Sequence, residues 1–394
     1  MSLKDNNYFC VLPWIHLHAD PDSKVRPCCV ANAANEEFGY LNKGNIEDLW
    51  NSNSYKNVRK KMLEGIPTDV CKYCYQIEKY GSNSLRNNMN NKWLTPELEN
   101  IIWQNTDKDG KYTSQGLLYW DIRYSNVCNF KCRMCGPGLS TKWYEDVDDW
   151  LKPQVCIDNI KSWCDKNKNY LKSIQEIYFA GGEPLVQVQH YEFLEWCIEN
   201  NVYPQLHYQS NGSKIQYGKW NIFDLWKNFP NVTFSLSLDG IGLIGEYIRK
   251  GYIDYVVKDN MNKILDFMGN NHSILINSTW QIYNVYYITE FFDEVDKLKW
   301  VMNTNNYTQL LINPEYLQAK VLPNKLKEVA IKKILDSKWY QLFPEKFELV
   351  VNNLHEESTN NLWQQFISYT NKLDGKRNES ILEVFPELRE YYEH

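Results

Sequence analysis

Cysteine is missing from the second half of the chain. The sequence has 394 residues and 11 cysteines, and all of the cysteines lie between Cys10 and Cys197. An odd number of unevenly spaced cysteines is not the pattern of a small secreted domain, in which disulfides between paired cysteines stabilise a weak core. A chain of this length has enough residues for two or three domains with cores of their own, so it does not need stabilising disulfides.

Long apolar runs and an excess of positive charge are missing as well. No stretch approaches the roughly 20 apolar residues of a membrane span, and the polar start of the chain lacks the apolar core of a secretory signal. The net charge is −6, so the chain as a whole is a poor ligand for nucleic acid. We therefore expect a cytoplasmic protein with no nucleic-acid or membrane partner. In that reducing compartment, grouped cysteines serve metals or chemistry more often than disulfides.

Strand and helix patterns alternate from about residue 118. Helical patterns at 189–199, 255–268 and 288–298 lie between strand candidates at 117–124, 174–180, 205–210, 232–238, 274–280 and 308–312. Such alternation predicts βαβ units with parallel strands. Six units favour an α/β fold of the partial (β/α)6 TIM-barrel type, with its ligands at the carboxyl ends of the strands.

Composition divides the chain into four regions. Residues 1–80 hold short apolar segments, turns and five cysteines, and predict a small N-terminal domain that a metal could organise. Residues 81–117 are polar and predict a bridging segment with one or two helices. Residues 118–320 would form the partial barrel, and residues 321–394 a mostly helical C-terminal region.

Three cysteines follow the first barrel strand with C-x3-C-x2-C spacing. Cys128, Cys132 and Cys135 lie in a loop at its carboxyl end, the edge where such barrels do chemistry. Three thiolates can hold three corners of a cubane iron–sulfur cluster and leave the fourth iron open to an exogenous ligand. Structural zinc is the alternative, but it needs four ligands, and only the distant His207 could add a fourth.

A glycine pair ends the second strand. Gly181 and Gly182 would let the backbone approach a ligand closely. Glu183 would then offer a carboxylate to a cationic group, and Pro184 starts the following segment. The alternative is a plain turn, which glycine pairs commonly form.

Together these two motifs resemble the signatures of radical S-adenosylmethionine (SAM) enzymes. The resemblance covers roughly residues 117–320. It implies that the three cysteines ligate a 4Fe–4S cluster whose open iron SAM chelates, and that Gly181, Gly182 and Glu183 hold the methionine amino group. It places further SAM contacts beside the last cysteine and at the ends of later strands: Met134, Pro184, Ser210, Asn211, Ser235, Ser237 and Arg249.

Two of these contacts have other interpretations. Arg249 could be a solvated helix charge instead of a carboxylate ligand. Met134 stands where the family often has an aromatic residue against adenine, although methionine can also pack on a base.

The resemblance also implies a reaction. An electron from the reduced cluster breaks the sulfonium bond of SAM, and the resulting 5′-deoxyadenosyl radical abstracts hydrogen from the substrate. A reductant such as flavodoxin or ferredoxin would supply that electron.

Four N-terminal cysteines form a second candidate ligand set, namely Cys10, Cys28 or Cys29, Cys71 and Cys74. On spacing alone, zinc and an iron–sulfur cluster fit this set equally well. The segments 9–29, 44–52 and 71–74 resemble the SPASM/twitch auxiliary-cluster domains of radical enzymes, which implies a second 4Fe–4S cluster. The family pattern has a glycine five residues before its second cysteine, and here Ser23 holds that place, which indicates Cys28 and not Cys29 as the ligand.

The position of this domain departs from the usual pattern, because these domains normally follow the barrel. Of the other cysteines, Cys156, Cys164 and Cys197 are expected to be core thiols.

The leading functional hypothesis is a radical enzyme that modifies a peptide or protein, because auxiliary-cluster members often act on peptides. A small-molecule substrate that is dehydrogenated or epimerised, such as a sugar, nucleotide or amino-sugar, is the alternative. A non-catalytic metal-binding interaction protein is the alternative from another class. Trp120, Tyr124, Trp143 and Tyr208 could line a substrate pocket, but aromatic residues are more often core.

Overall fold

The computed structural model describes residues 2–79, 83–113, 116–147, 151–269, 274–298, 300–302 and 309–392. Thr308, at the start of the sixth expected strand, lies outside them. The chain divides into two compact units. Unit 1 comprises Met1–Val127, Lys152–Tyr208 and Gly218–Val232, and unit 2 comprises Cys128–Leu151, Gln209–Tyr217 and Thr233–His394.

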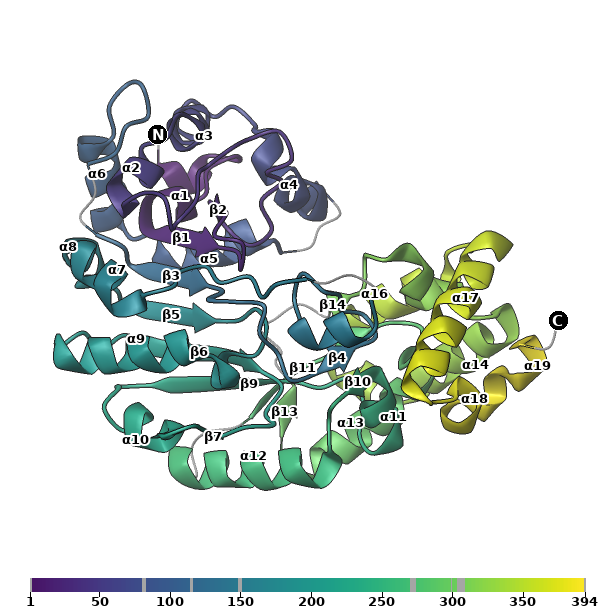
Figure 1. Cartoon of the computed structure of the whole chain (residues 1–394). Coiled ribbons are helices and arrows are strands. Elements are labelled where there is room, and N and C mark those ends of the chain that lie inside the picture. Colours follow the sequence, from purple (N-terminus) through teal and green to yellow (C-terminus); the bar gives the residue numbers. More distant parts are fainter. Residues whose placement is uncertain are drawn as a thin grey trace. The chain divides into compact units, whose positions relative to one another are not determined.

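A sheet with parallel strands organises unit 1. Strands β1 (His16–Ala19), β3 (Tyr119–Ile122), β5 (Glu176–Phe179) and β6 (Gln205–Ser210) are hydrogen-bonded in that order (Figure 1). Strand β2 (Val25–Arg26) pairs antiparallel with β1. The pairing of β1 with β3 joins the N-terminal region to the first predicted barrel strand, and the sequence did not predict it.

The two faces of this sheet differ in character. One face is apolar, and its Trp120 packs against Trp163 of α7 (Ile160–Lys166) and Phe193 of α9 (Val188–Glu199). The opposite face is polar. On it, the strand register places one residue from each strand in a row across the sheet: His18, Asp121, Tyr178 and His207.

Short helices make up the rest of unit 1. The N-terminal ones are α1 (Leu12–Ile15), α2 (Ile46–Trp50), α3 (Asn53–Leu63) and α4 (Lys72–Lys79). The fully buried Arg59 joins α3 to α1 and α2, because its guanidinium donates to the carbonyls of Pro13 and Trp50. The remaining elements are α5 (Leu85–Trp93), α6 (Pro96–Asn105), α8 (Lys168–Leu171), β8 (Trp220–Asn221) and α10 (Ile222–Trp226).

Unit 2 contains three further parallel strands in the order β9 (Val232–Ser237), β11 (Leu275–Asn277) and β13 (Val301–Met302). Helices α12 (Asp254–Met268) and α13 (Ile288–Lys297) follow β9 and β11 in the chain, as the helical periodicity predicts. The short strands β4 (Lys131–Cys132) and β10 (Arg249–Lys250) pair antiparallel, and α11 (Leu243–Ile248) precedes β10. Strand β7 covers Gln216–Tyr217.

The expected strand at 274–280 is divided in two. The carboxylate of Asp239 accepts the N–H of Thr279 at 2.7 Å, and β11 ends before it. The continuation β12 (Thr279–Trp280) pairs with β14 (Gln309–Leu310) in a separate two-stranded sheet. The strand predicted at 308–312 is therefore present as β14, but it pairs with β12, while β13 takes the place beside β11.

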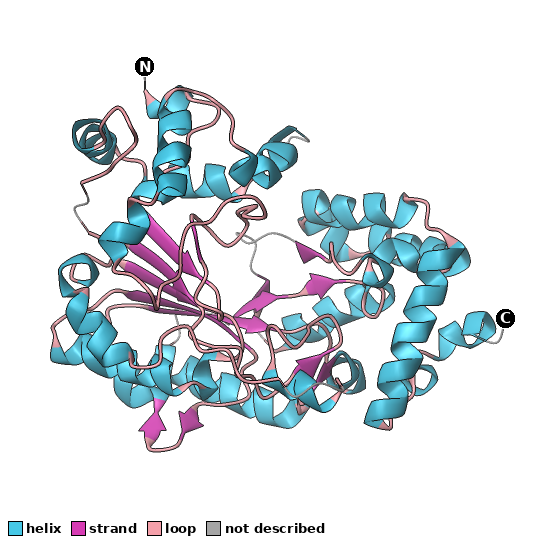
Figure 2. Cartoon of the chain, turned by 45° about the horizontal axis from the view of Figure 1, so that its top comes forward, coloured by secondary structure: helices cyan, strands magenta, loops and turns pink. Residues whose placement is uncertain are grey.

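Unit 2 is helical after residue 320 (Figure 2). Its helices are α14 (Asn324–Leu335), α15 (Lys338–Leu342), α16 (Pro344–His355), α17 (Asn360–Arg377), α18 (Ile381–Val384) and α19 (Arg389–Tyr392). The rings of Trp280, Phe292 and Phe347 pack together and tie α16 to β12 and α13.

The predicted α/β fold class of the partial (β/α)6 barrel type is confirmed in its parallel strands and intervening helices. Within the residues that the structure describes, no helix is both long enough and apolar enough to cross a bilayer.

Candidate functional site

The four N-terminal cysteines of the predicted ligand set converge in unit 1. Burial raises the pKa of Cys28, and the charges of Cys29, Cys71, Cys10 and Cys74 raise it further. Burial followed by the charges of Cys71 and Cys74 likewise raises the pKa of Cys10. Thiols affect one another in this way only when they are close neighbours, so these residues fit a shared thiolate site.

Cys29 faces different neighbours from Cys28. Cys29 is exposed. The surrounding protein and then the charge of Asp121 raise its pKa to about 12, and Arg123 opposes that rise. Of the four cysteines in the set, Cys74 also raises the pKa of Cys29, and by less than Asp121 does. Ser23, which replaces the expected glycine, adopts a φ of 70°, a conformation that glycine adopts more readily.

Helix α5 holds the segment around Cys10. Asn90 donates to the carbonyl of Phe9 at 2.9 Å and accepts from the N–H of Val11 at 2.8 Å. Arg86 also donates to the carbonyl of Phe9, at 2.8 Å. The backbone on both sides of Cys10 is thus fixed by side chains from a helix about 80 residues later.

The cysteine loop at 128–135 lies in unit 2 and is held by backbone donors. The N–H of Phe130 donates to Cys128 Sγ at 3.4 Å, and the N–H of Cys135 donates to the carbonyl of Cys132 at 3.0 Å. Burial and the nearby charge of Cys132 raise the pKa of Cys135 to about 12. Met134, between these two cysteines, is half-buried.

Arg249 lies directly opposite Cys132 in the β4–β10 pair. Its guanidinium donates to Cys132 Sγ at 3.8 Å and forms an ion pair with the fully buried Asp239 at 2.8 Å. The interpretation of Arg249 as a solvated helix charge is therefore wrong. Hydrogen bonds to a ligating sulfur tune the reduction potential of an iron–sulfur cluster, and Arg249 is placed to supply one.

The Ser210-Asn211 segment is joined to the same cysteine loop. Asn211 donates to Asn129 Oδ1 at 3.0 Å, and Asn129 donates to Ser213 Oγ at 2.8 Å. Asn129 is the residue after Cys128, so within unit 2 a side-chain network links the segment Gln209–Tyr217 to the candidate cluster ligands. Ser210 and Asn211 are both buried.

A polar row crosses the later strands of unit 2. Gln209 donates to Ser237 and accepts from Asn277, which is paired with Ser237 in the register of β9 and β11. Ser235 occupies the same side of β9 and is fully buried. These positions alternate with the buried Phe234, Leu236 and Leu238.

The glycine turn after β5 belongs to unit 1 and requires its glycines. Gly181 and Gly182 have φ values of 75° and 45°. A Cβ on Gly182 would lie 2.4 Å from the carbonyl oxygen of Val127. The N–H of Glu183 donates to that same carbonyl at 2.9 Å, so the turn is bonded to the residue that precedes Cys128. Glu183 and Pro184 are buried.

Several other candidates are core residues. The four aromatic residues considered for a substrate pocket are at most 5% exposed: Trp120, Tyr124, Trp143 and Tyr208. Cys156, Cys164 and Cys197 are fully buried, as expected for core thiols. Among the described residues, no three His, Cys, Asp or Glu side chains are arranged to hold a single metal ion.

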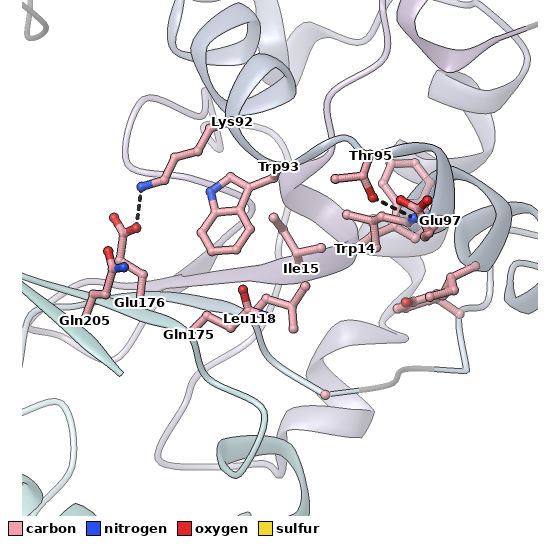
Figure 3. A pocket seen from close by; sticks show the side chains of 14 residues that line it. Trp14, Ile15, Lys92, Trp93, Thr95, Glu97, Leu118, Gln175, Glu176 and Gln205 are labelled. Carbon is pink, nitrogen blue, oxygen red and sulfur yellow. Dashed lines mark hydrogen bonds and ion pairs between the residues drawn. The ribbon is translucent and has the colours of Figure 1, made fainter. Parts of the chain in front are cut away.

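A cavity of about 530 Å³ lies at the amino ends of the strands of unit 1. Trp14, Ile15, Trp93 and Leu118 line it, and the ion pair of Lys92 with Glu176 stands at one side (Figure 3). The glycine turn lies at the carboxyl ends of the same strands, so this cavity is separate from it.

Two family models match this chain. The model of the radical SAM superfamily matches residues 122–277, and that of the SPASM iron–sulfur cluster-binding domain matches residues 10–75. Residues 122–277 therefore form a radical SAM domain, and residues 10–75 a SPASM domain. The cofactors of the chain are accordingly a 4Fe–4S cluster and SAM in the radical SAM domain, and an auxiliary 4Fe–4S cluster in the SPASM region.

Similar solved structures include three of SuiB from Streptococcus suis. The complex with SAM is 15% identical, with a TM-score of 0.36 over 66% of this chain and 56% of that chain. The complex with the precursor peptide SuiA is 13% identical, with a TM-score of 0.36 over 70% of this chain and 64% of that chain. SuiB alone is 14% identical, with a TM-score of 0.35 over 74% and 67%. The radical SAM protein thus spans little more than half of the first of these chains, and no curated protein matches its sequence.

Sequence reasoning missed three residues of this site, namely Asn129, Arg133 and Asp239. Asn129 contacts Asn211 and Asp239 contacts Arg249, two residues that the family motifs do identify. Arg133 instead pairs with Asp374 of α17. Arg133 and Asp239 are buried charges next to motif residues in the sequence, and that proximity is the one local signal that could have marked them.

Proposed function

We propose that this radical SAM protein is an enzyme that modifies a peptide or protein substrate by hydrogen abstraction. The observation that carries the proposal is the network in unit 2. There, Asn129 links the cysteine loop to Asn211, and Arg249 donates to Cys132 Sγ. When bound, the cluster and SAM would supply the 5′-deoxyadenosyl radical.

The chain's own residues would hold these cofactors. Cys128, Cys132 and Cys135 would ligate the SAM-binding cluster, and Cys10, Cys28, Cys71 and Cys74 the auxiliary one. The left-handed turn of Gly181 and Gly182 leaves the backbone open to close approach, which suits the methionine amino group. Glu183 would be the charge partner of that group.

The other SAM contacts would come from the polar strand ends. Ser210 and Asn211 would bind the ribose and methionine portions, while Ser235, Ser237 and Arg249 would face the methionine carboxylate. Met134 and Pro184 would pack against the cofactor. Because Asp239 already neutralises Arg249, we expect the serines to contribute hydrogen bonds and Arg249 to orient Cys132.

A peptide substrate is supported by the auxiliary-cluster domain, whose family members often act on peptides. Radical dehydrogenation or epimerisation of a small molecule is the second candidate. We further propose a cytoplasmic location, a flavodoxin- or ferredoxin-type reductant, and an oxidoreductase or maturase type of reaction. The domain boundaries at residues 80, 117 and 320 remain a prediction.

The decisive experiment is anaerobic reduction with dithionite in the presence of SAM. Protein with both clusters should form 5′-deoxyadenosine, and the Cys132→Ala variant should form none. A peptide encoded beside the gene should change mass when incubated with the enzyme, SAM and reductant. Failure of cluster-replete protein to cleave SAM would refute the enzymatic proposal. SAM cleavage without a mass change in the peptide would favour the small-molecule alternative.

A further inference from the structure

Arg123 is a cation at the carboxyl edge of the sheet of unit 1 that neither family motif includes. It follows the last residue of β3, and its backbone N–H donates to the carbonyl of Ala19 at 3.1 Å. Its side chain is 21% exposed. The guanidinium therefore lies at an edge that ligands of α/β barrels occupy, and solvent or a ligand can reach it.

The stem of Arg123 packs on the glycine turn. A Cβ on Gly181 would lie 2.6 Å from Cβ of Arg123 and 2.9 Å from its Cδ. Gly181 therefore makes room for the arginine stem, which fixes the guanidinium beside the segment proposed to hold the amino group of SAM.

The carboxylates near Arg123 already have closer partners. His18 Nδ1 lies 2.9 Å from Asp121 Oδ2, and Arg26 Nη2 lies 2.6 Å from Asp20 Oδ2. His18 Nε2 also bonds Asp20 Oδ1 at 3.2 Å. Both acids thus contact His18, and each has a partner that lies closer to it than Arg123 does.

Among the described residues, the guanidinium of Arg123 has a single ion pair, and it is long. Its Nε lies 3.7 Å from Asp121 Oδ1, beyond hydrogen-bond range. Within the described part of the chain, that buried Nε has no hydrogen-bond partner. A buried donor on a charged group is costly to leave unpaired. An anion that binds here would be attracted by the positive charge of the guanidinium and would accept hydrogen bonds from it.

We propose that Arg123 binds a carboxylate at this edge, either the methionine carboxylate of SAM or a carboxylate on the substrate. The planar fork of a guanidinium matches a carboxylate with two parallel hydrogen bonds. The proposal rests on the proposed function for the presence of SAM and a substrate at this edge.

The test measures equilibrium binding by calorimetry on the full chain with both clusters reconstituted. Four probes are compared: SAM, decarboxylated SAM, glutarate and its amide analogue glutaramide, the last two in the presence of SAM. The variants are Arg123→Gln and Arg123→Lys. The matched control is Arg26→Gln, because Arg26 is a cation of the same network that already has its partner.

If SAM supplies the carboxylate, Arg123→Gln weakens SAM binding by about 10- to 100-fold and leaves decarboxylated SAM unaffected. If the substrate supplies it, SAM affinity is unchanged and Arg123→Gln weakens glutarate but not glutaramide. Arg123→Lys should give an intermediate loss, because lysine keeps the charge without the fork.

Equal affinities of Arg123→Gln and Arg26→Gln for all four probes would overturn the proposal. The thermal midpoints of the variants show whether a loss reflects unfolding, and Arg123→Lys gives a second, milder variant. Absence of 5′-deoxyadenosine from the wild-type protein would count against the proposed function alone, since binding is measured without turnover.

Discussion

Arg133, which lies between Cys132 and Met134, forms an ion pair with Asp374 of α17, 241 residues later in the chain. The arginine side chain is fully buried, and its second carboxylate partner, Glu379, lies at 2.7 Å. Tyr369 of α17 also donates to the backbone carbonyl of Arg133, at 2.5 Å. The C-terminal helical region therefore holds the cysteine loop of unit 2 through both the side chain and the backbone of Arg133.

Replacing Asp374 with asparagine should loosen this loop. Asp374 also accepts from the hydroxyl of Tyr247 and the N–H of Ile381, so the change weakens three contacts to a charged group. We expect a loss of about 1.5–3 kcal/mol in the free energy of unfolding by urea and less iron bound at the SAM-binding site. Glu390→Gln is the control, because its pair with Lys325 is exposed and should leave both readouts unchanged. Equal iron content in both variants would show that α17 does not position the loop.

The roles of Cys28 and Cys29 can be separated by iron analysis. Two four-iron clusters give about eight irons per chain. Cys28→Ala should retain about four, because Cys28 is the neighbour of Cys10, Cys71 and Cys74. Cys29→Ala should retain about eight, because Cys29 faces Asp121 and Arg123. The reverse pattern would assign Cys29 as the ligand, and zinc in place of iron in the wild type would refute the auxiliary cluster.

Gly182→Ala should damage the turn after β5. Its positive φ disfavours a side chain, and the added Cβ would collide with the carbonyl of Val127. We expect a loss of about 1–3 kcal/mol in stability and weaker SAM binding, measured by urea unfolding and calorimetry. Gly375→Ala is the matched control, because a Cβ in α17 meets nothing within 4 Å and should raise stability by about 0.5–1 kcal/mol. A Gly182→Ala protein with normal SAM affinity would argue against the turn as part of the cofactor site.

The stability of the cluster-free protein should fall as the pH drops from 6 to 4. Burial lowers the pKa of His190 to about 3, whereas an unfolded histidine titrates near pH 6.5. The unfolded chain therefore binds more protons in this window, and each such site costs about 1.4 kcal/mol of unfolding free energy per pH unit. His190→Gln should remove the contribution of one such site, and so reduce the slope of unfolding free energy against pH by about 1.4 kcal/mol per pH unit.

Tyr208→Phe is the control for this pH dependence. It removes the hydroxyl 2.8 Å from His190 Nε2 but keeps the histidine buried, so the slope should remain. A slope that is unchanged in His190→Gln would show that the buried histidine does not contribute to it.

Local signals predicted much of this molecule. The C-x3-C-x2-C and Gly-Gly-Glu-Pro motifs are continuous in the sequence, and the strands β3, β5, β6 and β9 alternate in a way that burial on one face imposes. Contacts such as Asn129 with Asn211 and Arg133 with Asp374 could not be predicted, because each joins polar residues far apart in the chain. The separate pairing of the sixth strand, β14, with β12 was not predicted, because the carboxylate of Asp239 binds the backbone where β11 ends and Thr279–Trp280 forms a strand of its own.

The pairing of β1 with β3 has a consequence for biosynthesis. His16 and Tyr119, which are opposite one another in these strands, are separated by 103 residues. Strand β1 and all four cysteines of the N-terminal set leave the ribosome before β3 does. One edge of β1 therefore stays unpaired while the chain grows. An unpaired edge invites association with other chains, and a long-range parallel pairing forms slowly. The protein is thus most prone to aggregation during synthesis, after β1 has been made and before β3 is available to pair with it.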